Sequence, residues 1–328
     1  MHSLAERPAL ARIRELVSRR RLWSDDSTPL TADVAWSGRQ AYNLDCHIEG
    51  RHFPHGEPHL RWVGRRAVMA ACSDIVAAGA DPEILTVGLG WPSCRTETEL
   101  TDLYEGIADA CDELRLRLAG GDWQRAECVT LHCAVSGRLP DTGRPLRPEG
   151  RVGDMLVVSQ PLGDAWLGLH TPDISDSAPY RLPQLSRAFA SIARQHPAVH
   201  GMTDITDGLL HEIALVASNS HCGAVLHLDA IPRSSNWLSR VRPMEQQDDV
   251  LAWLLGSDEY ALLAAVDPAR WDELRTAVEK SGHSVYAVGL LEQGNTLRCV
   301  GSIPPQASHL ISPALLNQIA ARTLQSYA

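Results

Sequence analysis

The chain has 328 residues, which is more than one hydrophobic core usually holds, so two domains are expected. Its composition, 44% hydrophobic and 21% charged, is that of an ordinary globular protein. A formal net charge of -10 argues against a nucleic-acid binder, which needs a basic surface. The surplus of carboxylates is compatible with bound metal ions and equally with a merely acidic surface.

The start of the chain predicts a charged amphipathic helix over residues 4–22 and contains no apolar run of the signal-peptide type. No later stretch reaches the roughly 18 apolar residues that a membrane span needs. We therefore expect a cytoplasmic protein that has no membrane partner.

Hydrophobic periodicity predicts alternating elements in the first part of the chain. We expect a strand over residues 40–48, a helix over 61–78 that ends at Gly79, and a strand over 82–91. A second helix over 96–118 should end at Gly120-Gly121, and a strand follows over 128–137. This order is typical of an α/β or α+β domain, which we place at residues 1–140.

A segment rich in Pro, Gly and Arg follows from residue 138 and is typical of a domain linker or a long turn. The second domain, residues 141–328, should begin with a strand, a turn and a helix start over residues 155–169. Further helices are predicted over 180–195, 208–218 and 270–281, and strands over 224–230, 260–266 and 284–291. The predicted fold class is therefore α/β to α+β, in two domains.

Aspartates recur where the chain is expected to turn or where a charge interrupts an apolar element. Asp45 lies in an apolar strand and Asp74 in a helix of small apolar residues, so each must be paired or bind a cation if it is buried. Asp204 or Asp207 is equally suited to cap a helix N-terminus, and Asp122 is suited to a turn.

A group of such aspartates would form an oxygen-rich site of the kind that Mg²⁺ prefers. Several Mg²⁺ ions would neutralise a nucleoside triphosphate and stabilise charge during phosphoryl transfer. Neither G-x-x-x-x-G-K-[ST] nor G-x-G-x-x-G occurs in the sequence. Phosphate binding would therefore depend on metal ions and a few arginines rather than on a glycine-rich loop.

Eight short segments in chain order strengthen this hypothesis. They are Ser24-Asp25-Asp26, LDCHIEGRHF from Leu44, CSDIVAAGADP from Cys72, GGD from Gly120, LRPEGRVGD from Leu146, PLGDAWLGL from Pro161, DITDGL from Asp204 and GSDEYALL from Gly256. With them the chain resembles the thiamine-monophosphate kinase family. That family belongs to the superfamily of aminoimidazole ribonucleotide synthetase, selenophosphate synthetase and the hydrogenase-maturation dehydratase.

The resemblance implies a homodimer in which the sheet of an N-terminal α/β domain pairs with that of a second subunit. A C-terminal α+β domain with a mixed sheet follows, and the active site lies between the domains near the dimer interface. The implied enzyme is an ATP- and Mg²⁺-dependent kinase. It transfers the γ-phosphoryl group in line to thiamine monophosphate or a similar small phosphate, without a phosphoenzyme.

The resemblance also implies roles for individual residues. The implied Mg²⁺ ligands are Asp26, Asp45, Asp74, Asp122, Asp204 and Asp207. The implied nucleotide contacts are Gly121, Asp122, Arg147 and Thr206, and the implied acceptor contacts are His52 and Asp258. Arg147 suits bidentate phosphate binding, although an exposed linker arginine and a surface histidine are the alternatives for Arg147 and His52. The neighbouring His47, His55 and His59 are expected to lie on the surface.

The sequence departs from the family pattern at several places. Ser24 replaces a glycine, Asn43-Leu44 replaces a hydroxyl pair, and Trp123-Gln124 replaces Thr-Thr. Ala261 replaces a glutamate. These departures leave a second hypothesis open, an ATP-dependent dehydratase, cyclase or amidine-forming enzyme that activates an amide oxygen by phosphorylation. A nucleotide-binding subunit without turnover is the third.

Overall fold

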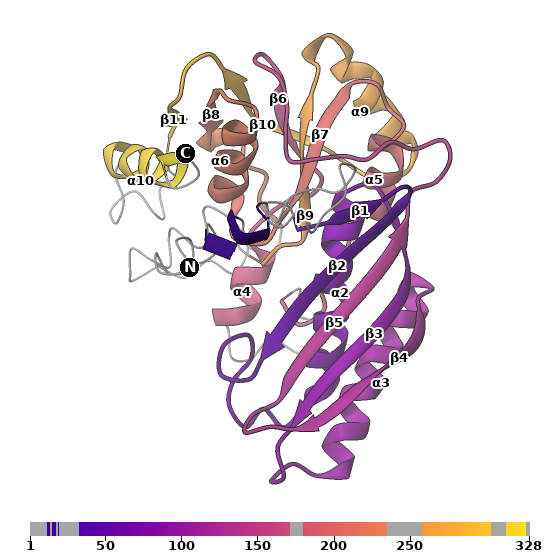
Figure 1. The fold of residues 1–328 in the computed structure, drawn as a ribbon. Helices are drawn as coiled ribbons and strands as arrows, with labels where there is room; N and C mark the ends of the chain where they lie inside the picture. Colours follow the sequence, from indigo (N-terminus) through magenta and orange to yellow (C-terminus); the bar gives the residue numbers. More distant parts are fainter. Residues whose placement is uncertain are drawn as a thin grey trace.

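The computed structural model describes residues 33–170, 180–234, 258–302 and 313–325, and six residues between 12 and 19 that are helical. Asp25 and Asp26 lie outside the described residues. The described chain forms a five-stranded and a six-stranded sheet, each with its own helices (Figure 1). No described helix is long and apolar enough to cross a membrane.

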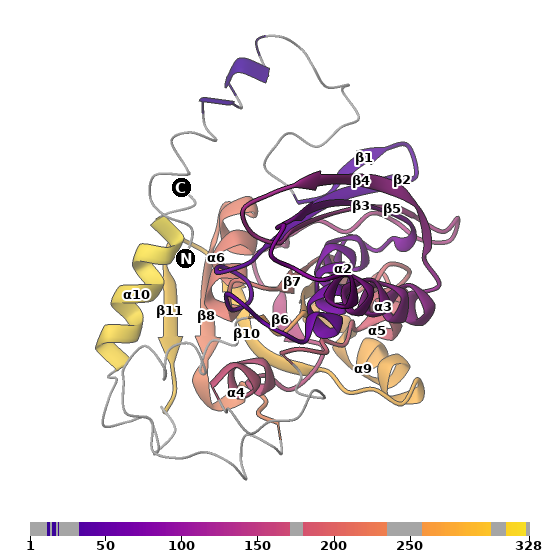
Figure 2. The same ribbon diagram turned by 90° about the horizontal axis from the view of Figure 1, so that it is seen from below.

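The first sheet has the strand order β1-β2-β5-β3-β4. All its neighbours are antiparallel except β3 and β4, which are parallel. The strands are β1 (Ala35–Ser37), β2 (Gln40–Ile48), β3 (Asp81–Trp91), β4 (Arg117–Arg125) and β5 (Thr130–Arg138). Helices α2 (Leu60–Ala77) and α3 (Glu97–Leu114) both lie on one side of this sheet, under its curve in Figure 2.

Two glycines allow α2 and α3 to pack with their backbones in contact. A Cβ atom at Gly106 would lie 1.7 Å from the carbonyl oxygen of Arg61, and one at Gly64 would lie 2.1 Å from that of Leu103. No side chain fits at either position, so the close helix pair depends on these two residues. α2 is consequently buried over most of its surface between α3, the first sheet and the second part of the chain.

The predicted helix over residues 96–118 with a Gly-Gly turn after it is wrong at its C-terminal end. The helix begins with a capping box between Thr96 and Glu99, as its sequence favours, but it ends at Leu114. Arg115 adopts the left-handed conformation, with φ 59°. Residues Arg117–Arg125, which include Gly120-Gly121-Asp122, then form the edge strand β4, because parallel pairing with β3 overrides the local turn signal.

The second sheet is mixed and has the order β11-β8-β10-β6-β9-β7. Its strands are β6 (Met155–Val158), β7 (Val199–Ile205), β8 (Gly223–His227), β9 (Ala261–Val266), β10 (Tyr286–Glu292) and β11 (Leu297–Val300). Its helices are α4 (Asp164–His170), α5 (Arg187–Ala193), α6 (Leu209–Asn219), α9 (Trp271–Lys280) and α10 (Pro313–Gln325).

Most predicted elements of the second part are confirmed, namely β6 with the start of α4, α6, β8, β9, α9 and β10. The helix predicted over residues 180–195 is wrong in extent, since only α5 is helical. β7 and β11 were not predicted, and β7 matters because it places Asp204 inside a strand.

The two parts of the chain share a hydrophobic core. Val76 and Ala77 at the end of α2 belong to the same buried cluster as Leu146, Phe189 and many side chains of the second sheet. The Leu146 N–H donates a 3.0 Å hydrogen bond to the Ala78 carbonyl oxygen. The α/β to α+β fold class is confirmed, whereas the boundary between residues 140 and 141 stays a prediction.

Candidate active site

The inner face of β2 carries Asn43, Asp45 and His47 in alternation. Their register partners on β5 are buried, so this face packs against α2. The Nδ2 of Asn43 donates hydrogen bonds to Asp74 Oδ2 at 2.5 Å and to the Ala71 carbonyl oxygen at 3.1 Å. β2 and α2 therefore bring Asp45 and Asp74, the two carboxylates that interrupt apolar elements, to the same side of the first sheet, where the charge of Asp45 acts on Asp74.

β7 adds a third carboxylate to this region. Asp204 lies near the end of β7, and its exposed fraction is 4%. Ser73 Oγ, from the residue before Asp74 on α2, donates a hydrogen bond to Asp204 Oδ2. Successive residues of α2 thus connect β2 of the first sheet with β7 of the second.

Asp33, Asp45, Asp74 and Asp204 form what we call the carboxylate cluster, and their charges disfavour one another. Burial raises the pKa of Asp204 to about 7, and it raises the pKa of Asp45. Burial and the nearby charge of Asp204 raise the pKa of Asp74 well above its usual value. Asp33 adds negative charge that acts on the other three. Cations bound among these oxygens would relieve the repulsion.

A pocket opens beside the carboxylate cluster, at the junction of the two parts of the chain. Its polar lining residues are Asp33, Asp74, Arg147, Thr203 and Asp204. The side chain of Arg147 is exposed, and its backbone carbonyl accepts a 2.8 Å hydrogen bond from the Met202 N–H of β7. The structure thus brings a predicted phosphate-binding arginine and two predicted metal ligands to one pocket.

Within the described chain, no group of three His, Cys, Asp or Glu side chains forms a ready-made metal cage. Mg²⁺ does not require one, because it usually binds one or two carboxylates and fills its shell with water and substrate phosphates. The carboxylate oxygens beside the pocket match that donor set.

Thr206 and Asp207 lie in the turn between β7 and α6. The N-cap of α6 is Gly208, with φ 111° and no side-chain cap, so the interpretation of Asp204 or Asp207 as a helix cap is wrong. Glu212, in the first turn of α6, is buried, and burial together with the charges of Asp204 and Asp207 raises its pKa well above the usual value. The turn therefore extends the negative charge of the cluster.

The predicted acceptor residues His52 and Asp258 lie around the buried side chain of Arg66. An Nη2 atom of Arg66 donates to Asp258 Oδ1 at 2.8 Å, and the guanidinium lies 4.1 Å from the ring centroid of Tyr180. The Tyr180 hydroxyl in turn donates to the His52 carbonyl oxygen at 3.1 Å. The ring centroid of Tyr260 lies 5.3 Å from the same guanidinium. Arg66 of α2 thus links the two acceptor positions.

The prediction that His47 lies on the surface is wrong. His47 is 4% exposed, whereas His55 and His59 are exposed as expected. Burial lowers the pKa of His47 to about 3, so its ring is neutral. Burial also lowers the pKa of the half-buried His52.

Asp122 lies apart from the carboxylate cluster within one chain. Cys46, His132, Gly88 and Asp122 are register partners across β2, β5, β3 and β4, so their side chains share one face. That face is the outer one, opposite to Asp45. Three strand spacings separate Asp122 from β2, roughly 14 Å. Gly121 and Asp122, predicted to bind nucleotide, are therefore exposed on the outer edge of the sheet.

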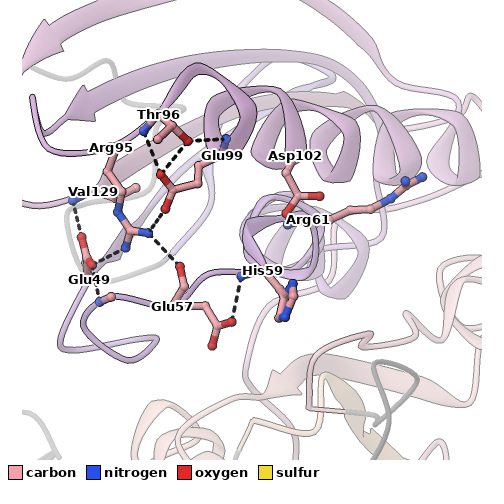
Figure 3. A network of polar contacts seen from close by, with 10 residues as sticks. Glu49, Glu57, His59, Arg61, Arg95, Thr96, Glu99, Asp102 and Val129 are labelled. Carbon is pink, nitrogen blue, oxygen red and sulfur yellow. Dashed lines mark hydrogen bonds and ion pairs between the residues drawn. The ribbon is translucent and has the colours of Figure 1, made fainter.

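A network of polar contacts holds the loop that contains His52 (Figure 3). Arg95 donates to Glu49 Oε1 at 2.6 Å and to the Glu57 carbonyl oxygen at 2.8 Å, and it pairs with Glu99 of α3. Glu49 also accepts the backbone N–H groups of Gly56 and Val129. The side chains of Arg95 and Glu49 are each 7% exposed. This pair ties both ends of residues 49–57 to α3 and to Val129, the residue before β5.

We expect Arg95→Met to destabilise the protein by about 3 kcal/mol, because it leaves the buried carboxylate of Glu49 without its cation. Urea unfolding followed by circular dichroism measures the change. Arg270→Met is the matched control, since the Arg270–Glu273 pair is exposed and contributes less than about 1 kcal/mol. Equal effects of the two substitutions would contradict the buried role of Arg95.

Two models of one family match the chain. The N-terminal domain model of AIR synthase related protein matches residues 29–139, and the C-terminal domain model matches residues 151–301. The chain belongs to the AIR synthase related protein family. Its relatives in that family include the thiamine-monophosphate kinase of Caulobacter vibrioides, 28% identical over 271 residues (78% of this chain and 76% of the relative). That of Prochlorococcus marinus is 28% identical over 320 residues, 90% of each chain.

Solved structures share the fold of this AIR synthase related protein. Thiamine-monophosphate kinase from Stenotrophomonas maltophilia superposes with a TM-score of 0.69 at 24% identity, over 88% of this chain and 95% of that one. AaThiL complexed with AMPPCP and TMP gives 0.70 at 20% identity, over 89% and 94%. The hydrogenase maturation protein HypE from E. coli gives 0.64 at 20% identity, over 81% and 84%.

Sequence reasoning missed several residues of this candidate site, namely Asp33, Arg66, Ser73, Tyr180, Glu212 and Tyr260. Arg66 had a usable signal, because it interrupts a helix of small apolar residues in the same way as Asp74. For the others the signal lies in the packing of α2 against β2 and β7, which the sequence pattern does not reveal.

The raised pKa values predict that stability depends on pH when metal is absent. The unfolded chain has an ordinary aspartate pKa near 3.8 and the folded Asp204 has one of about 7. Ionisation therefore costs folding free energy, and the metal-free protein should lose stability as the pH rises from about 4 through about 7. We expect the Mg²⁺-induced rise in Tm to be larger at pH 8 than at pH 5.5, because bound Mg²⁺ favours ionised carboxylates.

Differential scanning calorimetry with EDTA and with Mg²⁺ at both pH values tests this prediction. All buffers are free of calcium and have the same ionic strength, so that specific Mg²⁺ binding is separated from charge screening. A Mg²⁺ effect of the same size at both pH values would contradict the link to carboxylate ionisation.

Proposed function

We propose that the protein is an ATP-dependent kinase that transfers the γ-phosphoryl group to thiamine monophosphate. The observation that carries this proposal is the pocket that Asp74, Asp204 and Arg147 line together. The relatives that match three quarters of the chain or more are named thiamine-monophosphate kinase, which supports thiamine monophosphate as the acceptor.

We propose Asp45, Asp74, Asp204 and Asp207 as Mg²⁺ ligands, with Asp26 and Asp122 completing the set. Their fit rests on the raised pKa values of the buried members, which indicate carboxylates that lack compensating positive charge. Mg²⁺ bound there would neutralise the triphosphate and the charge that develops on the transferred group. The protein itself contributes fixed oxygen ligands and a site that is partly closed to water.

Arg147, Thr206, Gly121 and Asp122 are proposed to bind the nucleotide. The backbone carbonyl of Arg147 is hydrogen-bonded to β7, so its guanidinium is suited to donate hydrogen bonds to two phosphate oxygens at once. His52 and Asp258 are proposed to bind the acceptor, and Arg66 holds Asp258 in place. The acceptor phosphate would then lie between His52 and Asp258 on one side and the carboxylate cluster on the other, in line with the γ-phosphate.

We also propose that the protein is a homodimer formed by the outer face of the first sheet. Tyr42 and Leu44 of β2 are exposed on that face, 47% and 62% respectively. Asp122 lies on the same face, away from the other aspartates of its own chain. A second subunit packed on this face would cover the apolar side chains and supply Asp122 to a neighbouring site. The cytoplasmic location stays a prediction.

The direct test is incubation with thiamine monophosphate, ATP and Mg²⁺, followed by chromatographic detection of thiamine diphosphate. Stoichiometric ADP and thiamine diphosphate support the proposal, and no product at high enzyme concentration contradicts it. The alternative, activation of an amide oxygen, would release phosphate only with an amide-type substrate. Ala261 no longer favours that alternative, because it is fully buried in the core of the second sheet.

A further inference from the structure

His47 lies on β2 between a proposed metal ligand and a proposed acceptor residue. Its Nδ1 is 3.9 Å from Asp45 Oδ2, and its ring centroid is 5.1 Å from that of His52. The side chain is 5% exposed. Among the described residues neither of its ring nitrogens has a hydrogen-bond partner.

Such a residue destabilises the fold in the absence of ligands. A neutral imidazole has one N–H donor and one acceptor nitrogen, and burying either without a partner costs free energy. An apolar side chain of similar volume would fill the same space without that cost. Buried polar groups without partners are rare, so the histidine at this position calls for a function.

The orientation of Asp45 indicates what that function is. Asp45 Oδ1 already accepts the Cys46 backbone N–H at 2.7 Å, and Oδ2 is the oxygen that faces His47. A shift of about 1 Å would bring Nδ1 and Oδ2 into hydrogen-bond distance. Each carboxylate oxygen has two lone pairs, so hydrogen bonds to both oxygens still leave room for a metal ion.

We propose that His47 is a positioning residue that donates its Nδ1–H to Asp45 Oδ2 and so fixes this carboxylate for Mg²⁺. This inference rests on the proposed function, in which Asp45 is a metal ligand. Hydrogen bonds from residues behind a metal ligand orient it and increase its affinity for the ion. The folding free energy lost by burying His47 without a partner is then the cost of holding Asp45 in the orientation that binds Mg²⁺.

Three substitutions separate this role from a structural one. His47→Leu removes the donor, His47→Asn keeps an N–H close to the position of Nδ1, and His47→Gln places one near Nε2. Mn²⁺ binding is measured by electron paramagnetic resonance with a non-hydrolysable ATP analogue present, and Tm is measured in EDTA. His59→Leu is the control, because His59 is exposed and its side chain makes no cap contact.

We expect His47→Leu and His47→Gln to weaken Mn²⁺ binding about 10- to 100-fold, and His47→Asn to retain it within about threefold. The Tm of His47→Leu in EDTA should rise by about 2–4 °C, because an unpaired buried polar group is removed. Lower Tm with unchanged Mn²⁺ binding would identify a merely structural histidine and overturn the inference.

A measurement on the unaltered protein covers the case of a variant that does not fold. In ¹⁵N spectra of the histidine rings we expect His47 to carry its proton on Nδ1 and that proton signal to move downfield on addition of Mg²⁺ and the ATP analogue. A ring protonated on Nε2 in both states would overturn the inference. If the unaltered protein does not bind Mn²⁺ with the analogue, the proposed function itself fails, which is a different result from equal binding by all variants.

Discussion

Asp204→Asn is expected to lower kcat by about 10³-fold while leaving the metal-free protein at least as stable as the unaltered one. The substitution keeps the shape of the side chain and an acceptor for Ser73 Oγ, but it removes a charge that the proposed reaction needs. Because the pKa of Asp204 is raised by burial, removing the ionisable group also removes a source of instability that grows from about pH 4 and is complete above about pH 7. Loss of activity with a gain in Tm distinguishes a functional carboxylate from a structural one.

Steady-state formation of thiamine diphosphate and the Tm in EDTA at pH 8 are the two measurements. Asp112→Asn is the matched control, since Asp112 is an exposed residue of α3 far from the pocket. Both quantities should change little in the control. Asp204→Asn with near-normal kcat, or with a Tm lowered by several degrees, would contradict the proposed role.

Mixing two inactive variants, Asp122→Asn and Asp204→Asn, in equal amounts is expected to restore about one quarter of the normal activity. Within one chain Asp122 lies on the outer face of the sheet and Asp204 on the other side of it. If a site takes Asp122 from one subunit and Asp204 from the other, each mixed dimer contains one intact site. Random reassortment makes half of the dimers mixed, and one site of each is active.

Asp74→Asn mixed with Asp204→Asn is the control for this experiment. These two residues line one pocket of a single chain, so no mixed dimer has an intact site. Refolding the variants together and isolating mixed dimers through two affinity tags establishes that the subunits have exchanged. Mixed Asp122→Asn and Asp204→Asn dimers without activity would place all the ligands of one site in one chain.

The sequence predicted those site positions whose signal is local. Asp45 and Asp74 are charges within apolar elements, and the structure brings both into the carboxylate cluster. β2 and α2 were predictable because their periodic apolar residues face a core on a regular strand and helix.

The sequence did not predict features that depend on contacts between distant segments. Gly120-Gly121 is a turn signal by itself, and only pairing with β3 makes it part of a strand. His47 is a polar residue among other histidines, and only the packing of α2 on β2 buries it. Arg66 acquires its role from Tyr180 and Asp258, which lie more than a hundred positions further along the chain.

The core shared by the two parts of the chain has a consequence for synthesis on the ribosome. Val76 and Ala77 are covered by Phe189, Leu262 and other side chains that are translated much later. The end of α2 therefore remains exposed to water, and to chaperones, after the first sheet has been completed. A fragment that ends near residue 140 would keep this apolar surface permanently, so we expect the nascent first half to need protection until β9 has been synthesised.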